Sequence, residues 1–143
     1  MGKSMVRNLM KAGFEVSIYT RTKSKVEDVI GEGAIWCDSV TECAKGRDAV
    51  ISIVGYPKDV IEVYFGPAGI LANADPGTYV IDMTTTSPKL AVQIFDEAEK
   101  LGLHAIDAPV TGGDSGAKAG TLTILAGGKK EDFDTCIPVF EAM

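Results

Sequence analysis

Two short runs of apolar residues constrain the fold of this chain most strongly. Residues 48–54 (DAVISIV) and 79–83 (YVIDM) are nearly continuous apolar segments, rich in β-branched side chains and bounded by turn-forming residues. Runs of this length and composition are typical of strands buried on both faces, as in a parallel sheet covered by helices. The chain therefore needs helices on both sides of a sheet.

The segments between such strands have the pattern of amphipathic helices. The clearest is 87–101, where Ser87 is expected to cap the helix, Pro88 lies in its first turn and Gly102 ends it. Because helices and strands alternate, we predict an α/β fold with a doubly wound, mainly parallel sheet. Further helices are expected at 1–11, 23–30, 39–45, 57–64 and 131–143, the last running to the end of the chain, and further strands at 15–20, 34–37, 104–108 and 121–126.

Composition narrows the class of protein. A chain of 143 residues, 45% of them hydrophobic, suits one domain with a real core. The net charge is −6 and no basic cluster is present, which argues against a nucleic-acid partner. No apolar run reaches the roughly 18 residues of a membrane span, and no signal peptide is recognisable. The three cysteines and one histidine have no metal or disulfide spacing, so we expect a cytoplasmic protein without membrane or metal partners.

Ligands of doubly wound folds bind at the carboxyl ends of the strands, so the loops after four predicted strands are candidate sites. The first loop contains Thr20, Arg21 and Thr22. An acidic residue at this place accepts the ribose hydroxyls of NAD, whereas a neutral residue beside an arginine suits the 2′-phosphate of NADP. A solvated arginine in a polar loop is the alternative interpretation.

The next two loops offer backbone and hydroxyl groups. Gly55 permits close approach of a ligand to the backbone, and Pro57 begins a helix whose free N–H groups face the same side. Residues 84–87 (TTTS) present four hydroxyls before a helix, of which one caps it and the others could bind a nicotinamide amide or a substrate oxygen. Ordinary turn and capping chemistry is the alternative for both loops.

The most specific segment is 107–113 (DAPVTGG), which opens a glycine-rich loop expected to run to Gly120. The adjacent Gly112 and Gly113 would expose consecutive backbone N–H groups that suit a carboxylate, aided by the Thr111 hydroxyl. A plain flexible loop is the alternative.

Candidate catalytic groups are few. Lys118 is expected to be solvated and His104 to have a structural role. The carboxylates are dispersed, which gives poor support to a paired-acid mechanism, and no Ser-His-Asp arrangement is visible. The sequence therefore indicates binding elements and no catalytic residue.

These motifs together resemble the β-hydroxyacid dehydrogenase family, which includes 3-hydroxyisobutyrate dehydrogenase, tartronate semialdehyde reductase and glyoxylate/succinic semialdehyde reductase. A more distant relative is 6-phosphogluconate dehydrogenase. The segments that carry the resemblance are MGKSMVRNLMKAG, GPAGIL, VIDMTTTSP and DAPVTGG followed by GAKAGTLTILAGG.

The resemblance implies that residues 1–143 are an incomplete NAD(P)-binding domain of the Rossmann type. The first strand and two phosphate-binding glycines of the family would be missing, which should leave an open strand edge with unpaired N–H and C=O groups. The family's catalytic lysine and the all-helical second domain, which builds the dimer, match nothing here. The chain by itself is therefore expected to be inactive and the intact enzyme to be a homo-oligomer.

The resemblance also assigns residues to a site. NADP is the expected cofactor, with NAD possible, and the substrate is expected to be a small 3-hydroxy acid or semialdehyde. The alternatives are a phosphogluconate-type oxidative decarboxylase, which the lack of basic residues for a sugar phosphate disfavours, and a non-catalytic dinucleotide-binding module. The expected cofactor-binding residues are Gly2, Thr20, Arg21, Thr22, Val54, Gly55, Asp59 and Thr85, and the expected substrate-binding residues are Thr111, Gly112 and Gly113.

Overall fold

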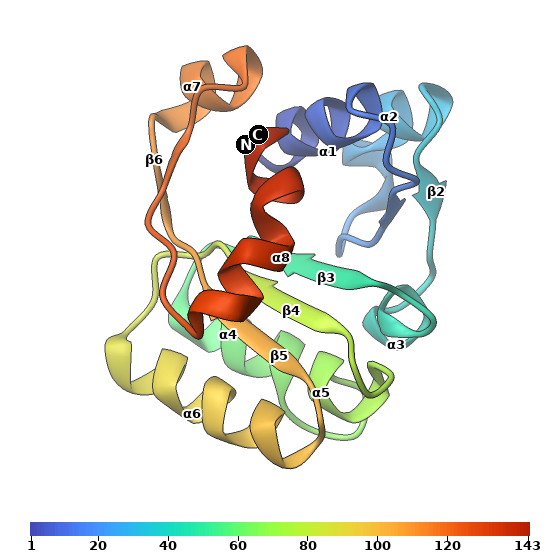
Figure 1. Cartoon of the computed structure of the whole chain (residues 1–143). Helices are drawn as coiled ribbons and strands as arrows, with labels where there is room; N and C mark the ends of the chain where they lie inside the picture. Colours follow the sequence, from blue (N-terminus) through green and yellow to red (C-terminus); the bar gives the residue numbers. More distant parts are fainter.

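A three-stranded parallel sheet is the centre of the fold (Figure 1). The structure is a computed structural model that describes residues 1–143. The sheet consists of β3 (Ala49–Ser52), β4 (Tyr79–Asp82) and β5 (His104–Asp107), in that order. The predicted α/β fold with a mainly parallel sheet is confirmed.

Helices cover both faces of this sheet, and side chains that alternate along each strand divide the core in two. Val50, Val80 and Ala105 belong to a cluster of 12 buried residues on one face, and Ile81 and Ile106 belong to a cluster of nine on the other. The first face is covered by α3 (Val40–Ala44), α4 (Pro57–Tyr64), α5 (Ile70–Asn73) and α6 (Pro88–Lys100), and the second by α1 (Gly2–Lys11), α7 (Gly113–Ala119) and α8 (Lys130–Glu141).

A second, smaller parallel pair lies apart from the central sheet. It consists of β1 (Ser17–Ile18) and β2 (Ile35–Trp36), connected by a short 3-10 helix (Lys23–Lys25) and α2 (Glu27–Gly31). The buried residues Ile18, Val29 and Ala34 form a separate small cluster there. Neither strand pairs with β3.

One edge of β3 has no strand beside it. Tyr79 N–H donates to Asp48 O at 3.0 Å and Met83 N–H donates to Ser52 O at 2.8 Å, so the even-numbered residues of β3 face β4. Because backbone groups alternate in direction along a strand, those of Ala49 and Ile51 face the opposite edge. The predicted open edge is therefore confirmed.

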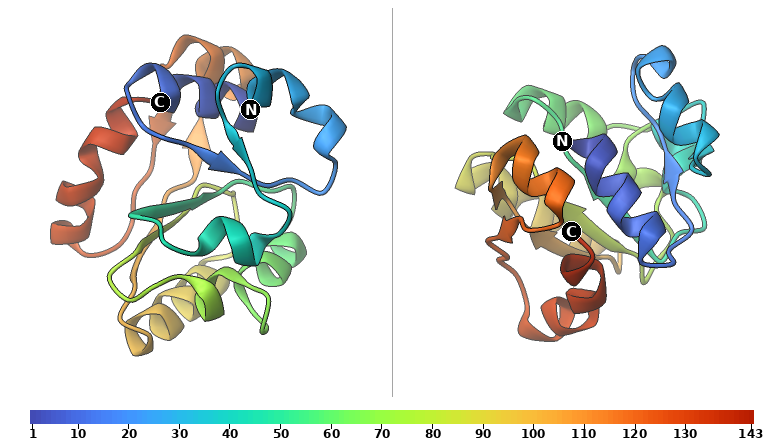
Figure 2. Two further views of the ribbon diagram at one scale, coloured as in Figure 1. Left: turned by 90° about the vertical axis from the view of Figure 1, so that its right-hand side faces the viewer. Right: turned by 90° about the horizontal axis from the view of Figure 1, so that it is seen from above.

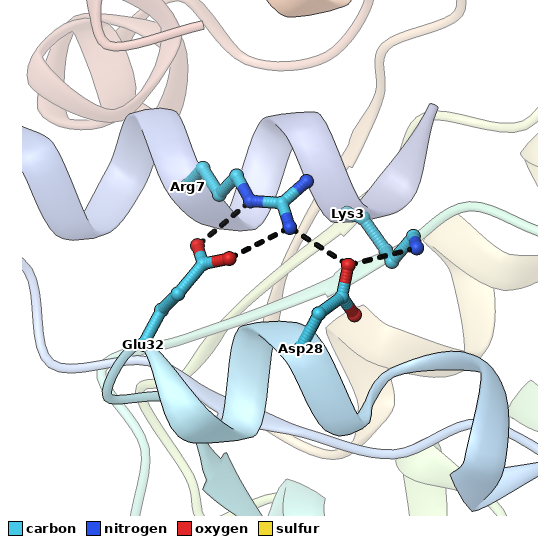
Figure 3. A network of polar contacts seen from close by, with 4 residues as sticks. All are labelled: Lys3, Arg7, Asp28 and Glu32. Atoms are coloured by element: carbon cyan, nitrogen blue, oxygen red, sulfur yellow. Dashed lines mark hydrogen bonds and ion pairs between the residues drawn. The ribbon is translucent and has the colours of Figure 1, made fainter.

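Exposed charged residues join α1 to the segment of α2 (Figure 3). The Arg7 guanidinium donates to both carboxylate oxygens of Glu32, at 2.7 and 2.8 Å, and to Asp28 Oδ2 at 2.8 Å. Lys3 Nζ donates to the same Asp28 oxygen at 3.1 Å. Hydrogen bonds from Lys3 and Arg7 lower the pKa of Asp28 to about 2. The network orients α1, although solvent screens each of its pairs.

Helix capping follows the sequence pattern closely. Ser87 Oγ accepts from Leu90 N at 3.1 Å, as predicted for the start of α6, and Ser39 Oγ accepts from Glu42 N at 3.1 Å. Pro57 occupies the first turn of α4. None of the helices combines the length and the apolar character that crossing a bilayer requires.

The segment after β5 differs most from the prediction. Instead of a loop running to Gly120, Gly113–Ala119 form α7, flanked by an antiparallel pair of β6 (Val110–Thr111) and β7 (Thr123–Ile124). Gly116 lets α7 lie close to Leu122, because an added Cβ would lie 3.3 Å from Leu122 Cδ2. Asn8 Nδ2 also donates to Ala117 O at 2.7 Å and ties α7 to α1, which lie side by side in Figure 2.

Two smaller features also differ from the prediction. The last helix does not run to the end of the chain, because α8 ends at Glu141 and the Met143 side chain turns into the core. The short helix α5 was not predicted, since its four residues are too few to show a period.

The open edge of β3 predicts a hydrogen-exchange pattern. The amides of Ala49 and Ile51 should exchange about tenfold or more faster than those of Val50 and Ser52, because only the latter face β4. Met83, whose N–H is bound to Ser52 O, is the internal control. Equal protection of all four amides, measured by NMR, would show that another segment pairs with this edge.

Candidate functional site

Hydrogen bonds between distant residues draw the strand-end loops together. Arg21, in the loop after β1, donates from Nη2 to Asp59 Oδ1 near the start of α4, at 2.6 Å. Val54 N–H, just after β3, donates to Thr84 Oγ1 after β4, at 3.0 Å. Ala108 N–H, just after β5, donates to the carbonyl oxygen at the end of β4 at 2.8 Å. All four loops therefore meet at the carboxyl edge of the strands.

Asp59 holds Arg21 and caps α4 at the same time. Its side chain is only 11% exposed, and its Oδ2 accepts from Tyr56 N at 3.0 Å. The hydrogen bond from Arg21 holds the pKa of Asp59 below its usual range. Both carboxylate oxygens are thus engaged within the protein. Asp59 was expected to bind the cofactor. In the structure its carboxylate holds the Arg21 side chain in place.

Arg21 itself remains available to a ligand. Its side chain is 62% exposed, and one nitrogen accounts for its contacts with Asp59 and, at 3.7 Å, with Glu62. A guanidinium carries five N–H donors, so several remain for an anion. Its neighbours Thr20 and Thr22 carry no charge, so Arg21 provides the cation of this loop.

Some hydroxyl groups of the loop after β4 make structural hydrogen bonds, and others lie at the surface. Thr84 is buried, and its N–H donates to Asp82 Oδ1 at 3.1 Å, while Ser87 caps α6. Thr86 Oγ1 is buried without a hydrogen-bond partner. Thr85 is exposed, so its predicted contact with a cofactor is sterically open and stays a prediction.

A row of polar residues lies beneath these loops. Ser52, Asp82 and Asp107 end β3, β4 and β5 at the same register. Ser52 Oγ donates to Asp82 Oδ1 at 3.0 Å and lies 2.8 Å from the hydroxyl oxygen of buried Tyr64. Sequence reasoning missed this row. The available signal was one polar residue at the end of each of three apolar runs, DAVIS, YVID and HAID.

Two glycines make the turn from β6 into α7. Gly112 has φ +127° and Gly113 has φ +62°, conformations that favour glycine. Thr111, which precedes them, is exposed at the end of β6. The expected substrate segment is thus an exposed hydroxyl followed by a sharp backbone turn, and its role in binding stays a prediction.

The start of α1 lies at the same edge. An added Cβ at Gly2 would lie 3.6 Å from Ile53 Cγ2, an ordinary van der Waals distance, so packing alone does not require glycine there. Gly55 is exposed, and its added Cβ would lie 3.5 Å from Asp59 Oδ2. The Met1 ammonium lies 3.1 Å from Asp114 Oδ1 of α7.

Two other polar residues lie outside this site. His104 begins β5, at the opposite edge of the sheet, where its Nδ1 lies 3.0 Å from Asp132 Oδ1 and its ring stacks on Tyr79 at 4.5 Å. This arrangement agrees with the structural role predicted for His104. Lys118 is exposed in the last turn of α7. The structure contains no group of three or more side chains suited to hold a metal ion.

A parallel sheet covered by helices on both faces is the architecture of doubly wound α/β domains, a class that includes the dinucleotide-binding domains. Residues 1–143 match the family described as the NAD binding domain of 6-phosphogluconate dehydrogenase, and the chain belongs to this family.

Relatives with curated names support this placement. The chain is 52% identical to the uncharacterized oxidoreductase YkwC of Bacillus subtilis. It is 38% identical to an NAD-dependent L-serine dehydrogenase and 37% identical to a 3-hydroxyisobutyrate dehydrogenase, both of Pseudomonas aeruginosa. Each match covers 100% of this chain and 48–50% of the relative. The chain therefore spans about half the length of these proteins.

Solved structures show the same fold. A 3-hydroxyisobutyrate dehydrogenase of Mycobacterium tuberculosis with L-serine has a TM-score of 0.93 and 31% identity, over 100% of this chain and 48% of that one. Psf3 in complex with NADP+ and 2-OPP has a TM-score of 0.94 and 26% identity, over 99% of this chain and 50% of that one.

The bond between Val54 and Thr84 predicts a stability effect. Thr84→Val keeps the shape of the side chain but leaves the Val54 N–H without its acceptor, so the free energy of unfolding should fall by about 1–2 kcal/mol. Thr85→Val, the same change at the exposed neighbour, should alter it by less than about 0.5 kcal/mol. Urea unfolding followed by circular dichroism measures both, and equal losses would contradict the network.

Proposed function

We propose that this chain is the cofactor-binding domain of an NADP-preferring dehydrogenase that interconverts a small 3-hydroxy acid and its semialdehyde. The observation that carries the proposal is the joining of the strand-end loops, with Arg21 exposed at the place where a dinucleotide's ribose is read. The 3-hydroxyisobutyrate dehydrogenases among the relatives support the substrate class.

The residues present fit an anionic dinucleotide despite the net charge of −6. Arg21 supplies a local cation, and the exposed Gly55 leaves the backbone approachable after β3. The start of α1, at the same edge, adds the positive end of a helix dipole. When bound, the nicotinamide would supply the hydride acceptor or donor of the reaction.

The choice between NADP and NAD rests on the loop after β1. The relatives include an NAD-dependent enzyme and a neighbour solved with NADP+, so they leave both cofactors open. In this chain the Arg21 donors that Asp59 leaves free would bind a 2′-phosphate, and Thr20 offers no carboxylate to the ribose hydroxyls of NAD.

Substrate would lie between the remaining loops. The Thr111 hydroxyl and the backbone N–H groups at Gly112 and Gly113 would bind the substrate carboxylate, and the exposed Thr85 would orient the nicotinamide side of the cofactor. His104 begins β5 at the opposite edge of the sheet and Lys118 lies in the last turn of α7, so neither residue is assigned here as general acid or base.

Replacing Arg21 tests the cofactor assignment. Arg21→Ala should weaken binding of NADP by about tenfold or more, a loss of about 1.4 kcal/mol, and leave binding of NAD unchanged, because only NADP carries the 2′-phosphate. Lys45→Ala removes an equal charge from an exposed residue after α3 and is the matched control. Calorimetric titration of each variant with both nucleotides gives the comparison. Equal loss for both nucleotides, or no loss for either, would contradict the role of Arg21.

A further inference from the structure

The carboxyl groups of Asp82 and Asp107 lie on neighbouring strands at the same register. Side chains of paired residues in a parallel sheet point to the same face, so both groups lie on the α6 side of the sheet. Asp82 is only 4% exposed. Its Oδ1 accepts two hydrogen bonds, whereas its Oδ2 is buried without any partner. A buried carboxylate oxygen without a partner is strongly unfavourable.

No cation balances these two groups. A pocket of about 510 Å³ is lined in part by Asp82 and Asp107, and α6 contributes only apolar side chains to its wall. Lys129 lies at this pocket, but its Nζ is bound to Glu99 Oε2 at 2.7 Å. From α4 the Tyr64 hydroxyl faces these groups, and it is bound to Ser52. Two full negative charges would therefore remain without a cation, one on the buried Asp82 and one on the half-buried Asp107.

We propose that Asp82 and Asp107 share one proton across the carboxyl ends of β4 and β5. One carboxyl group keeps its proton and donates it to the other, which remains a carboxylate, so the pair carries a single negative charge. This arrangement gives a buried oxygen the partner that the remaining protein does not provide. Burial raises the pKa of both groups, and the charge of Asp82 adds to the effect at Asp107.

The shared proton would make both residues positioning residues for the loops above them. Asp82 Oδ1 accepts a hydrogen bond from the Thr84 N–H. The Thr84 hydroxyl oxygen accepts one from the Val54 N–H and so holds the loop after β3. Asp107 leads directly into the segment that ends at Gly112 and Gly113. Repulsion between two full charges would push these chain segments apart. This part of the inference rests on the proposed function, since it concerns the loops that would hold cofactor and substrate.

Thermal unfolding between pH 4 and pH 8 tests the shared proton without any ligand. Because the pKa values of Asp82 and Asp107 are raised in the folded state, the stability that this pair contributes is lost as the pH rises above the unfolded value near 4. Asp107→Asn removes one of the two charges, so its Tm relative to wild type should increase over this range, by roughly 4 °C. Asp96→Asn, at an exposed residue of α6 without charged partners, should show a constant difference.

A constant difference for Asp107→Asn, or one that falls as the pH rises, would overturn the proposal. A falling difference is the behaviour of a carboxylate paired with a cation. A carbon NMR titration of the carboxyl groups in the wild-type chain is a second test of the shared proton, and it needs no variant. The pair should show one apparent pKa above those of the other aspartates. Two ordinary titrations would also overturn the proposal.

Variants of Asp82 test the link to the loops. Asp82→Asn keeps an oxygen acceptor for the Thr84 N–H and places an amide N–H where the shared proton would lie. Its NADP affinity should therefore match that of the wild type at a pH below the titration of the pair and exceed it at a pH above that titration. Asp82→Ala should lose affinity at both pH values. Equal behaviour of the two variants would overturn the positioning role. If the wild-type chain binds no dinucleotide, the proposed function and this link both fail, while the Tm profile and the carboxyl titration still decide the shared proton.

Discussion

The parallel, in-register pairing of β3, β4 and β5 is the constraint on which the rest of the molecule depends. It brings the carboxyl ends of three strands to one edge and places Ser52, Asp82 and Asp107 in a row beneath the loops that follow them. The loops are then joined above that row by bonds such as that from Val54 N–H to Thr84 Oγ1. The site is thus a consequence of strand register more than of any single loop sequence.

Much of this arrangement is encoded locally and could be predicted. The apolar runs specify β3 and β4, and Ser87 marks the start of α6 by the hydrogen bond that it makes. The helix α7 could not be predicted, because the glycines in its sequence are typical of a loop. Its stability depends on contacts that sequence spacing does not show, such as the bond from Asn8 to a carbonyl 109 residues away.

Part of the candidate site could likewise be predicted from the sequence, and part of it could not. The rule that ligands bind at the carboxyl ends of parallel strands was enough to select loops that the structure joins by hydrogen bonds, including the loop of Arg21. The environment of Asp59 was not predictable, since its bond with Arg21 joins residues 38 positions apart and occupies the carboxylate. The same holds for Asp82, which looks like an ordinary strand-terminal aspartate until the register places it beside Asp107.

We propose that a dinucleotide binds across the joined loops at this edge. A nitrogen–proton NMR titration of the chain with NADP detects such binding residue by residue. The backbone amides of residues 20–22, 54–56, 84–86 and 111–113 should shift, with little change at the opposite edge around Asp48 and His104. Shifts confined to that opposite edge, or none at saturating nucleotide, would contradict it.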